Sequence, residues 1–467
     1  MSDRITVVEV ASAGGPGTAR PRDGVVHTRS FTGLYRTVRV GIGGVLFALF
    51  FATAWVNWNG RQAVLWDLAD SKFHVFDTTF WPQDFILLSA LLILCAFGLF
   101  AVTVFAGRVW CGYTCPQSTW TWLYMWCEKI CEGDRNQRIK LAAAPWSVAK
   151  FTRRLLKHLL WLAIALLTGL TFVGYFTPIR PLAAELISLQ LSGVALFWVV
   201  FFSAATYLNA GWLREAVCMH MCPYARFQGV MFDQDTLAVA YDPRRGETRG
   251  PRKKGSDAAD GRLGDCVDCT LCVQVCPTGI DIRDGLQMAC IGCAACIDAC
   301  DGVMDKMGYA RGLIGYKSEN TLQGTHAHWL RPRLLGYITA LVVMIGALIL
   351  ALQWRPMVSL DVIKDRGLFR ENARGQIENI YLLKVINKTD QPQRYHLRLV
   401  DADGFALHGK ADFTLGAGEM GELPVSVALL ADRPSSSSQD LVFQVQDSDE
   451  PTISSTARSR FVAPLNR

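Results

Sequence analysis

Cysteine is missing from both ends of this 467-residue chain. All 15 cysteines fall between Cys95 and Cys300, and residues 301–467 contain none. A disulfide framework would spread cysteines through a secreted chain, so this regional use indicates a cofactor site instead. Residues 1–30 are rich in Gly, Pro, Arg and Ser, and they lack a short apolar run followed by a small-residue cleavage site. We therefore expect no signal peptide and interpret residues 1–34 as a disordered cytoplasmic tail.

A strong excess of one charge is missing as well. The chain has 47 Lys and Arg residues against 41 Asp and Glu residues, a net charge of +6. This balance is too mild to imply nucleic acid as a partner. Apolar residues, in contrast, make up 51% of the chain, which is high for a soluble protein of this length. The composition indicates membrane segments joined to polar domains.

Five stretches are long and apolar enough to cross a membrane, for which a helix needs about 20 mostly apolar residues. All five are nearly free of charge, which argues against buried helices of a soluble core. They cover approximately residues 38–58, 85–106, 155–176, 186–209 and 334–354.

The positions of Lys and Arg in the connecting loops predict the orientation of these spans. The loops after the second and fourth spans are strongly basic, whereas the loops after the first and third contain only Arg61 and Lys72 or Arg180. We therefore expect the N-terminus, residues 107–154 and residues 210–332 to face the cytoplasm. The chain after the fifth span then faces the other side, the periplasm of a Gram-negative bacterium.

Two cysteine runs have the spacing of two-cluster ferredoxins. Residues 266–277 read CVDCTLCVQVCP and residues 290–301 read CIGCAACIDACD, each with the pattern Cys-x2-Cys-x2-Cys-x3-Cys. In such proteins the fourth cysteine of each run ligates the other cluster. Zinc would need only two CxxC pairs, and a cytoplasmic location disfavours disulfides. We therefore expect two [4Fe–4S] clusters, one held by Cys266, Cys269, Cys272 and Cys300, the other by Cys276, Cys290, Cys293 and Cys296.

Two further cysteine pairs have the spacing Cys-x3-Cys-Pro. CGYTCPQ contains Cys111 and Cys115, and CMHMCPYARFQ contains Cys218 and Cys222. Each pair follows a span that runs toward the cytoplasm, so the arrangement is a weak internal repeat whose four cysteines would meet at one membrane-edge site. Residues i and i+4 share a helix face, which would place each pair of thiolates side by side. The proline restrains the second cysteine toward extended geometry and can start the next helix.

Four convergent thiolates suit Cu(I), Zn²⁺ or an iron–sulfur cluster. Met219, His220 and Met221 add thioether and imidazole groups and favour copper, although the methionines would equally pack at a membrane interface. Cys127 and Cys131 lie in the aromatic stretch WTWLYMWCEKICEGD, which predicts an interfacial helix. A supplementary metal site and ordinary reduced cysteines both stay open for this third pair.

The chain after the fifth span alternates apolar and polar residues with period two, which predicts a β-sandwich of about 100 residues. It contains no catalytic constellation, so we expect a binding or assembly role. The predicted fold is a multi-domain membrane protein with a five-span helical bundle. Its predicted parts are the tail 1–34, the four-helix region 35–232, a cytoplasmic dicluster ferredoxin-like domain 233–332, the fifth span 333–356 and a periplasmic immunoglobulin-like β-sandwich 357–467.

Several motifs together resemble the CcoG/FixG/RdxA family of cytochrome c oxidase accessory proteins. They are FWPQDF before the second span, CGYTCPQ after it, CMHMCPYARFQ after the fourth, the two ferredoxin runs and YKSEN at 316–320. The resemblance implies a bacterial inner-membrane protein that reduces Cu(II) to Cu(I) for maturation of cbb-type cytochrome c oxidase. It also implies reaction at Cys111, Cys115, Cys218 and Cys222. The implied partners are oxidase subunits or copper chaperones and transporters, together with an unidentified cytoplasmic electron donor.

Two rival functions stay open. CxxxCP pairs beside a dicluster domain also resemble the NapH-type membrane ferredoxins, which relay electrons between quinol and a partner without binding copper. The other rival is a non-enzymatic scaffold for oxidase assembly, in which the clusters are structural and the sandwich recruits subunits. Copper binding and Cu(II) reduction distinguish these functions from the one that the family resemblance implies.

Overall fold

The computed structural model describes most of the chain, namely residues 26–69, 71–252, 263–328, 330–367, 369–372, 374–389, 391–430 and 437–464. Residues 1–25 of the predicted tail therefore lie outside the described residues. Contacts divide the chain into two compact units. One contains the chain up to Phe76 together with Pro82–Gly346, and the other contains Asp77–Trp81 together with the chain from Ala347 onward.

Five helices of the described chain are long and apolar enough to cross a membrane, which confirms the five predicted spans. They are α1 Leu34–Thr53, α2 Phe85–Ala106, α6 Val148–Val173, α8 Gly193–Thr206 with a π-helical extension to Leu213, and α14 Pro332–Gln353. The predicted start of the fourth span at residue 186 is wrong. A separate helix, α7 Ile179–Ile187, ends there, and the Ser192 hydroxyl accepts a hydrogen bond from the Ala195 N–H at 3.3 Å to cap α8.

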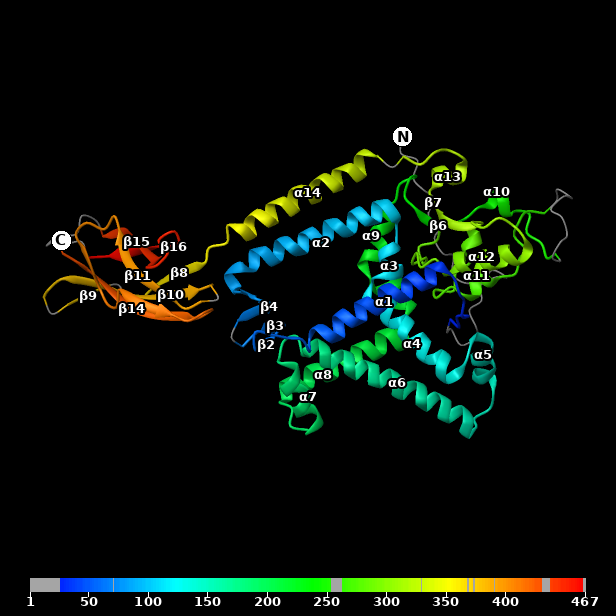
Figure 1. The fold of residues 1–467 in the computed structure, drawn as a ribbon, viewed down its shortest axis with the longest axis horizontal. Helices are drawn as coiled ribbons and strands as arrows, with labels where there is room; N and C mark the ends of the chain where they lie inside the picture. Colours follow the sequence, from blue (N-terminus) through cyan, green and yellow to red (C-terminus); the bar gives the residue numbers. More distant parts are fainter. Residues whose placement is uncertain are drawn as a thin grey trace. The chain divides into compact units, whose positions relative to one another are not determined.

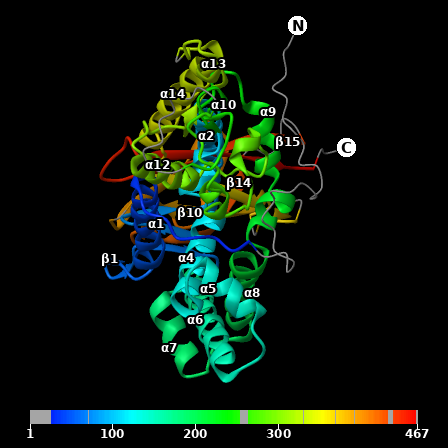
Figure 2. The ribbon, with the colours of Figure 1, turned by 90° about the vertical axis from the view of Figure 1, so that its right-hand side faces the viewer.

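Small and aromatic residues set how these helices pack. Figures 1 and 2 show α6, α7 and α8 close together. A Cβ atom on Gly169 of α6 would lie 2.7 Å from the carbonyl oxygen of Val199 in α8, so only glycine allows this approach. Across the same pair of helices, the ring centroids of Phe172 and Phe202 are 4.2 Å apart. In Figure 1, α14 runs beside α2. There the ring centroids of Tyr337 and Phe97 are 6.3 Å apart.

Shorter elements connect the spans. The helices are α3 Val109–Tyr113, α4 Pro116–Glu132, α5 Arg135–Ala143 and α9 Pro223–Met231, and the short strands are β1 Asn57–Trp58, β2 Arg61–Gln62, β3 Val64–Asp67, β4 Lys72–Val75 and β5 Thr78–Phe80. Helix α4 confirms the predicted helix in the aromatic stretch. Its Glu128 is buried and forms ion pairs with Arg138 of α5, at 2.7 Å, and with Arg214. This network joins α4 to α5 and to the segment after the fourth span.

The cysteine runs lie in a small domain built on an antiparallel strand pair. Its elements are β6 Ala238–Tyr241, α10 Pro243–Gly246, α11 Leu271–Gln274, α12 Ala295–Met307, β7 Ile314–Lys317 and α13 Glu319–Gln323, with β6 paired to β7. The first span is attached to this domain. The Asp298 carboxylate of α12 accepts hydrogen bonds from the backbone N–H groups of Tyr35 at 3.1 Å and Arg36 at 2.7 Å. It therefore caps the N-terminus of α1, where Gly33 has no side chain to do so.

Residues 28 and 29 contact α5 and the same small domain. The Arg29 N–H donates to the carbonyl of Gln274 at 2.8 Å, and Arg138 donates to the carbonyl of Thr28 at 2.6 Å. The prediction of a disordered tail as far as residue 34 is therefore wrong for residues 27–30, because their backbone groups bond to distant parts of the chain.

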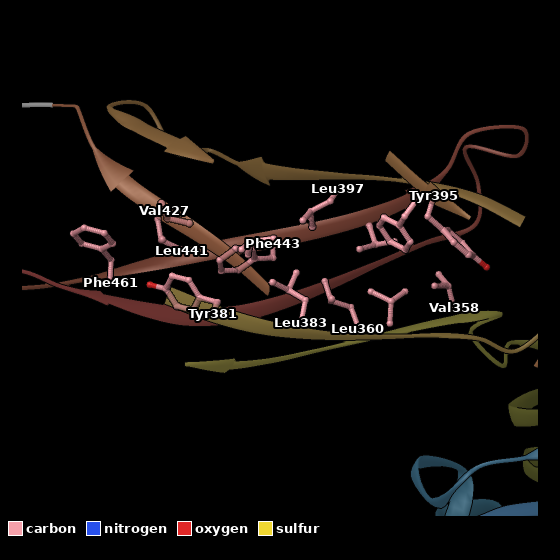
Figure 3. Packing of buried hydrophobic residues seen from close by; sticks show 14 of the residues in the cluster. Val358, Leu360, Tyr381, Leu383, Tyr395, Leu397, Val427, Leu441, Phe443 and Phe461 are labelled. Atoms are coloured by element: carbon pink, nitrogen blue, oxygen red, sulfur yellow. The ribbon is translucent and has the colours of Figure 1, made fainter. Parts of the chain in front are cut away.

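The second unit is a β-sandwich, as the period-two pattern predicts. One sheet has the order β12-β14-β10-β8 with β9 added to β10, and the other has the order β13-β11-β15-β16. The strands are β8 Val358–Lys364, β9 Arg370–Glu371, β10 Ile377–Asn387, β11 Gln393–Val400, β12 Phe405–His408, β13 Asp412–Leu415, β14 Met420–Leu429, β15 Ser438–Asp447 and β16 Ser454–Val462. Figure 3 shows the inward side chains, among them Tyr381 and Phe443, whose ring centroids are 5.1 Å apart.

Candidate iron–sulfur and membrane-edge cysteine sites

The structure brings the eight ferredoxin-type cysteines together in two sets. Cys266, Cys269, Cys272 and Cys300 line one cavity of about 360 Å³. Cys276, Cys290, Cys293 and Cys296 line a second cavity of about 340 Å³, which Cys272 also touches. The fourth cysteine of each run therefore lies with the first three of the other run, as the ferredoxin spacing predicts.

Matching backbone geometry shapes the two runs. Thr270 and Ala294 each follow the second cysteine of their run, and both have left-handed backbone, with φ of 57° and 58°. The residues before that cysteine, Asp268 and Gly292, also have positive φ. A non-glycine residue costs roughly 1 kcal/mol or more in this conformation. The same strain at equivalent positions indicates a loop shaped to surround a bound group.

The chemistry of the two cavities fits iron–sulfur clusters. Burial raises the pKa of the Cys272 thiol to about 12, although the Arg283 guanidinium opposes that rise. Burial likewise raises the pKa of Cys290 to about 12, and the backbone N–H of Gly292 opposes it. Thiolates in such surroundings need bound cations, which a cluster's iron ions supply. The apolar lining, including Ile282, Ile291 and Leu313, keeps water away from the sulfurs.

The CxxxCP cysteines lie at equivalent places in two helix junctions. Cys111 is in α3 and Cys115 directly precedes α4, whereas Cys218 is in a π-helical turn, Val217–Met221, and Cys222 directly precedes α9. The second cysteine of each pair has extended backbone, with ψ of 126° and 111°, and the next residue is the proline that starts a helix. The predicted effect of the proline is confirmed. The prediction of two thiolates on one helix face is wrong, because each helix ends before its second cysteine.

The four membrane-edge thiols interact electrostatically. Burial raises the pKa of Cys111 to about 11, and Cys115 and Cys222 raise it further, against a hydrogen bond with Gln228. Burial raises the pKa of Cys218 to about 12, with further increases from Cys115, Cys111 and Cys222. The buried Gln228 amide reaches the Cys111 sulfur at 3.6 Å. The two halves of the repeat therefore meet, as the sequence predicts.

A ready-made site for a single ion is not present in the described part of the chain. There, no group of three or more His, Cys, Asp or Glu side chains is arranged to hold one metal ion. This does not conflict with the clusters, because thiolates around a cube of iron and sulfur stand further apart than the ligands of one ion. At the four CxxxCP cysteines, binding of a single ion would require the thiols to move closer together.

The other candidate ligands differ in their surroundings. Met219 is half-buried, while His220 and Met221 are exposed, so their role as ligands stays a prediction. Cys127 is only 2% exposed and packs with Tyr124, Trp161 and Ala210 in a hydrophobic cluster. This packing favours ordinary reduced cysteine at Cys127.

A direct contact between the cluster loop and the membrane-edge cysteines is the main feature that the sequence does not reveal. A Cβ atom on Gly112, next to Cys111, would lie 2.7 Å from the Gly292 carbonyl oxygen and 2.9 Å from the Cys293 Cα. The backbone of CGYTC thus rests on the loop that holds the second set of cysteines. Cys111 also packs against the hydrophobic cluster that contains Cys293.

Two further side chains hold this contact. The Arg108 guanidinium donates to the carbonyls of Met288 and Cys290 in the cluster loop and to the carbonyl of Ala225 in α9. Tyr316 donates to the Gly292 carbonyl at 2.6 Å. The sequence offered weak signals for both, since Arg108 stands just before CGYTC and Tyr316 opens YKSEN. Neither signal identifies the partner.

The fold and these sites define a class: a membrane iron–sulfur protein with a dicluster ferredoxin-like domain and an immunoglobulin-like β-sandwich. Comparison with known families agrees. The profile of a "4Fe-4S dicluster domain" matches residues 213–319, and that of an "IG-like fold at C-terminal of FixG" matches residues 348–464.

Full-length relatives identify the family. The chain is 35% identical over 393 residues to nitrogen fixation protein FixG of Rhizobium meliloti (strain 1021), covering 76% of this chain and 75% of that protein. It is 38% identical over 396 residues to protein RdxA of Cereibacter sphaeroides, covering 81% and 83%. The chain therefore belongs to the FixG/RdxA family of iron–sulfur proteins. A more distant relative is the methylamine utilization ferredoxin-type protein MauN of Methylorubrum extorquens, 26% identical over 195 residues, which are 42% of this chain and 54% of MauN.

Proposed function

We propose that this protein is a membrane oxidoreductase that reduces Cu(II) to Cu(I) at the four CxxxCP cysteines, in support of the assembly of a cbb-type cytochrome c oxidase. The observation that supports it most is the backbone contact between Gly112 and Gly292, which places Cys111 beside the second set of cluster cysteines. An electron donor site and a soft-ligand site in direct contact are what a copper reductase needs.

The ligand sets follow the two cavities. Cys266, Cys269, Cys272 and Cys300 would hold one [4Fe–4S] cluster, and Cys276, Cys290, Cys293 and Cys296 would hold the other. When bound, such clusters supply electrons one at a time. One electron converts Cu²⁺ to Cu⁺ with no bond to a proton or oxygen formed or broken, and the electron donor is oxidised by one unit.

The chain's own residues have three roles in this reaction. Cys111, Cys115, Cys218 and Cys222 offer sulfur ligands, which bind Cu(I) better than Cu(II) and so favour the reduced product. Gln228 orients the Cys111 thiol through its hydrogen bond. Arg108 fixes the cluster loop against α9, so that the distance between the second set of cluster cysteines and the CxxxCP cysteines stays constant.

The loop charges support an orientation for this reaction. With the basic loops on the inside, both the clusters and the CxxxCP cysteines face the cytoplasm of a bacterial inner membrane, and the β-sandwich faces the periplasm. A cytoplasmic reductant then reaches the clusters directly. The sandwich is left to contact oxidase subunits or copper-transfer proteins.

The test is anaerobic addition of Cu(II) to purified, dithionite-reduced protein, with the visible cluster absorbance and a Cu(I)-specific chelator as readouts. We expect the wild type to be reoxidised while Cu(I) accumulates. Cys111→Ser and Cys218→Ser should keep both clusters and lose most of this reaction. Cys95→Ser, an exposed thiol in α2, is the matched control and should behave as the wild type. Unchanged Cu(I) formation in both CxxxCP variants would refute the proposal.

Two observations favour a second candidate, an electron relay between quinol and a protein partner. The described residues contain no ready-made single-ion site, and MauN, a relative by sequence, is a ferredoxin-type protein. On this alternative the CxxxCP cysteines bind no copper. Wild-type protein would then show no copper stoichiometry that depends on Cys218 and Cys222, and a reduced quinol analogue would reduce the clusters.

A further inference from the structure

An open-sided pocket of about 590 Å³ lies outside both cluster cavities and the CxxxCP site. Residues 28–31, α1, α4 and α5 form most of its walls, and Val275 and Pro277, on either side of Cys276, complete it. We call it the cationic pocket, because five basic side chains line it, namely Arg29, Arg36, Arg39, Lys129 and Arg138.

Carboxylates do not balance these charges. Asp134 is the one acidic residue among the described lining residues, and its carboxylate already accepts the Ser30 N–H at 3.0 Å and caps α5. Arg138 is paired with Glu128, which it shares with Arg214. Among the described residues, Arg36, Arg39 and Lys129 form no ion pair with a carboxylate. The pocket therefore carries an excess of positive charge.

Arg39 makes the pocket more than a basic surface. Arg39 lies in the first turns of α1 and is only 8% exposed. It has no hydrogen-bond or ion-pair partner in the described part of the chain, although an uncompensated buried guanidinium is strongly unfavourable. The buried Nε of Arg138 also lacks a partner there. The Arg39 guanidinium and the buried Nε of Arg138 are therefore the donors that this pocket offers to a ligand.

Arg39 also lines a second cavity, which connects the cationic pocket with the membrane-edge site. That cavity shares Trp122, Met125 and Pro277 with the cationic pocket and extends to Cys218. A group bound at Arg39 therefore sits between solvent and the redox site, but it touches none of the four cysteines that we assign to the second cluster.

We propose that the cationic pocket binds a phosphate group, with Arg39 as its main ligand. Guanidinium groups bind phosphate oxygens in pairs, and several cations around one hollow match its multiple charge. The setting also fits a phosphate at membrane depth, because α1 continues from the pocket as an apolar span and Trp122 and Trp126 line the pocket as interfacial aromatics do. The phosphate belongs either to a lipid headgroup or to a soluble phosphate compound. The inference does not depend on copper reduction.

The test uses the full chain with both clusters, in two arms. In the first, protein in nanodiscs of phosphatidylcholine with added phosphatidylglycerol is examined by native mass spectrometry for retained lipid. In the second, detergent-purified protein is titrated with inorganic phosphate while tryptophan fluorescence reports on Trp122 and Trp126. The variant is Arg39→Gln. Arg226→Gln, which removes an exposed arginine of α9 outside the pocket, is the matched control.

We expect Arg39→Gln to bind at least about tenfold more weakly, as for loss of one charged hydrogen-bonding group, and Arg226→Gln to bind as the wild type. Arg39→Lys should recover part of the affinity, which a folding defect would not allow. Retained lipid without saturable phosphate binding assigns the site to a headgroup, and saturable phosphate binding assigns it to a soluble compound; both support the pocket. Wild-type protein that binds neither probe, or equal weakening by Arg226→Gln, overturns the proposal.

Discussion

Replacing Gly112 by alanine should open the contact between α3 and the cluster loop. The new Cβ atom would lie 2.7 Å from the Gly292 carbonyl oxygen, about 0.7 Å short of the 3.4 Å at which ordinary contact begins. Its other near neighbours, the Cys293 Cα and the Gly292 carbonyl carbon, both at 2.9 Å, are backbone atoms too. Backbone atoms cannot rotate away, so the whole loop has to shift.

The size of the effect follows from overpacking. Inserting one methyl group into a closely packed contact costs about 1–3 kcal/mol. That cost corresponds to a roughly 5- to 150-fold larger population of the opened loop. Alanine also gains about 0.5–1 kcal/mol over glycine inside a helix, which offsets the lower end of this range. The net expectation is measurable opening with the clusters still bound.

Hydrogen–deuterium exchange of the full chain is the assay. In Gly112→Ala, amides in α3 and in the loop before Cys293 should exchange faster, at most by the factor by which the population of the opened loop increases. If electrons pass through this contact, reoxidation of the reduced clusters by Cu(II) should slow as well. Gly302→Ala in α12 is the control, because a Cβ there meets nothing within 4 Å. Wild-type exchange and reoxidation rates in Gly112→Ala would refute the reasoning.

Two further predictions concern the stability of the two units. Glu128→Gln leaves Arg138 and Arg214 buried without their common counter-charge, which should cost about 3–5 kcal/mol and lower the thermal unfolding midpoint followed by tryptophan fluorescence. Burial raises the pKa of Glu128 but the two arginines lower it below the usual range, so the stabilisation is present at neutral pH and the difference from wild type should shrink only in strong acid. Exposed Glu185→Gln is the control, and equal midpoints for the two variants would contradict the burial argument. In the sandwich, Phe443→Ala should cost about 3–5 kcal/mol, because the ring is fully buried, whereas Val442→Ala on the opposite face of β15 should cost much less. Hydrogen–deuterium exchange of the β10 and β15 amides measures the loss of stability in each variant. Similar losses for the two substitutions would show that Phe443 is not a core residue.

Several features were predictable because they depend on short stretches of chain. Twenty apolar residues in a row predict a span whatever surrounds them, and five were found. Alternation with period two predicts strands, and the sandwich follows from having enough of them. A proline after Cys115 or Cys222 restricts the backbone of its neighbour, which is again a local effect. Even the position of each run's fourth cysteine, beside the first three cysteines of the other run, follows from a fixed spacing within 35 residues.

The errors have a common origin. The sequence predicts a fourth span that starts too early, because apolar residues continue through the break between α7 and α8. Composition alone does not show where backbone hydrogen bonds change partners. Residues 26–33 look like a polar tail, but Gln274 and Arg138 supply partners for residues 28 and 29 from far along the chain. The two thiolates of each pair do not share a helix face, because the same proline that starts the next helix also ends the first.

The sequence by itself determined which parts this protein has: five spans, two sets of cluster cysteines, a repeated CxxxCP motif and a sandwich. Each is encoded by periodicity or spacing over a few tens of residues. Only the tertiary structure decided which parts touch. The contact of Gly112 with Gly292, the capping of α1 by Asp298 and the approach of Lys129 and Arg138 to Arg39 join residues at least 90 positions apart. No local pattern specifies such neighbours, because they depend on how the finished elements pack against one another.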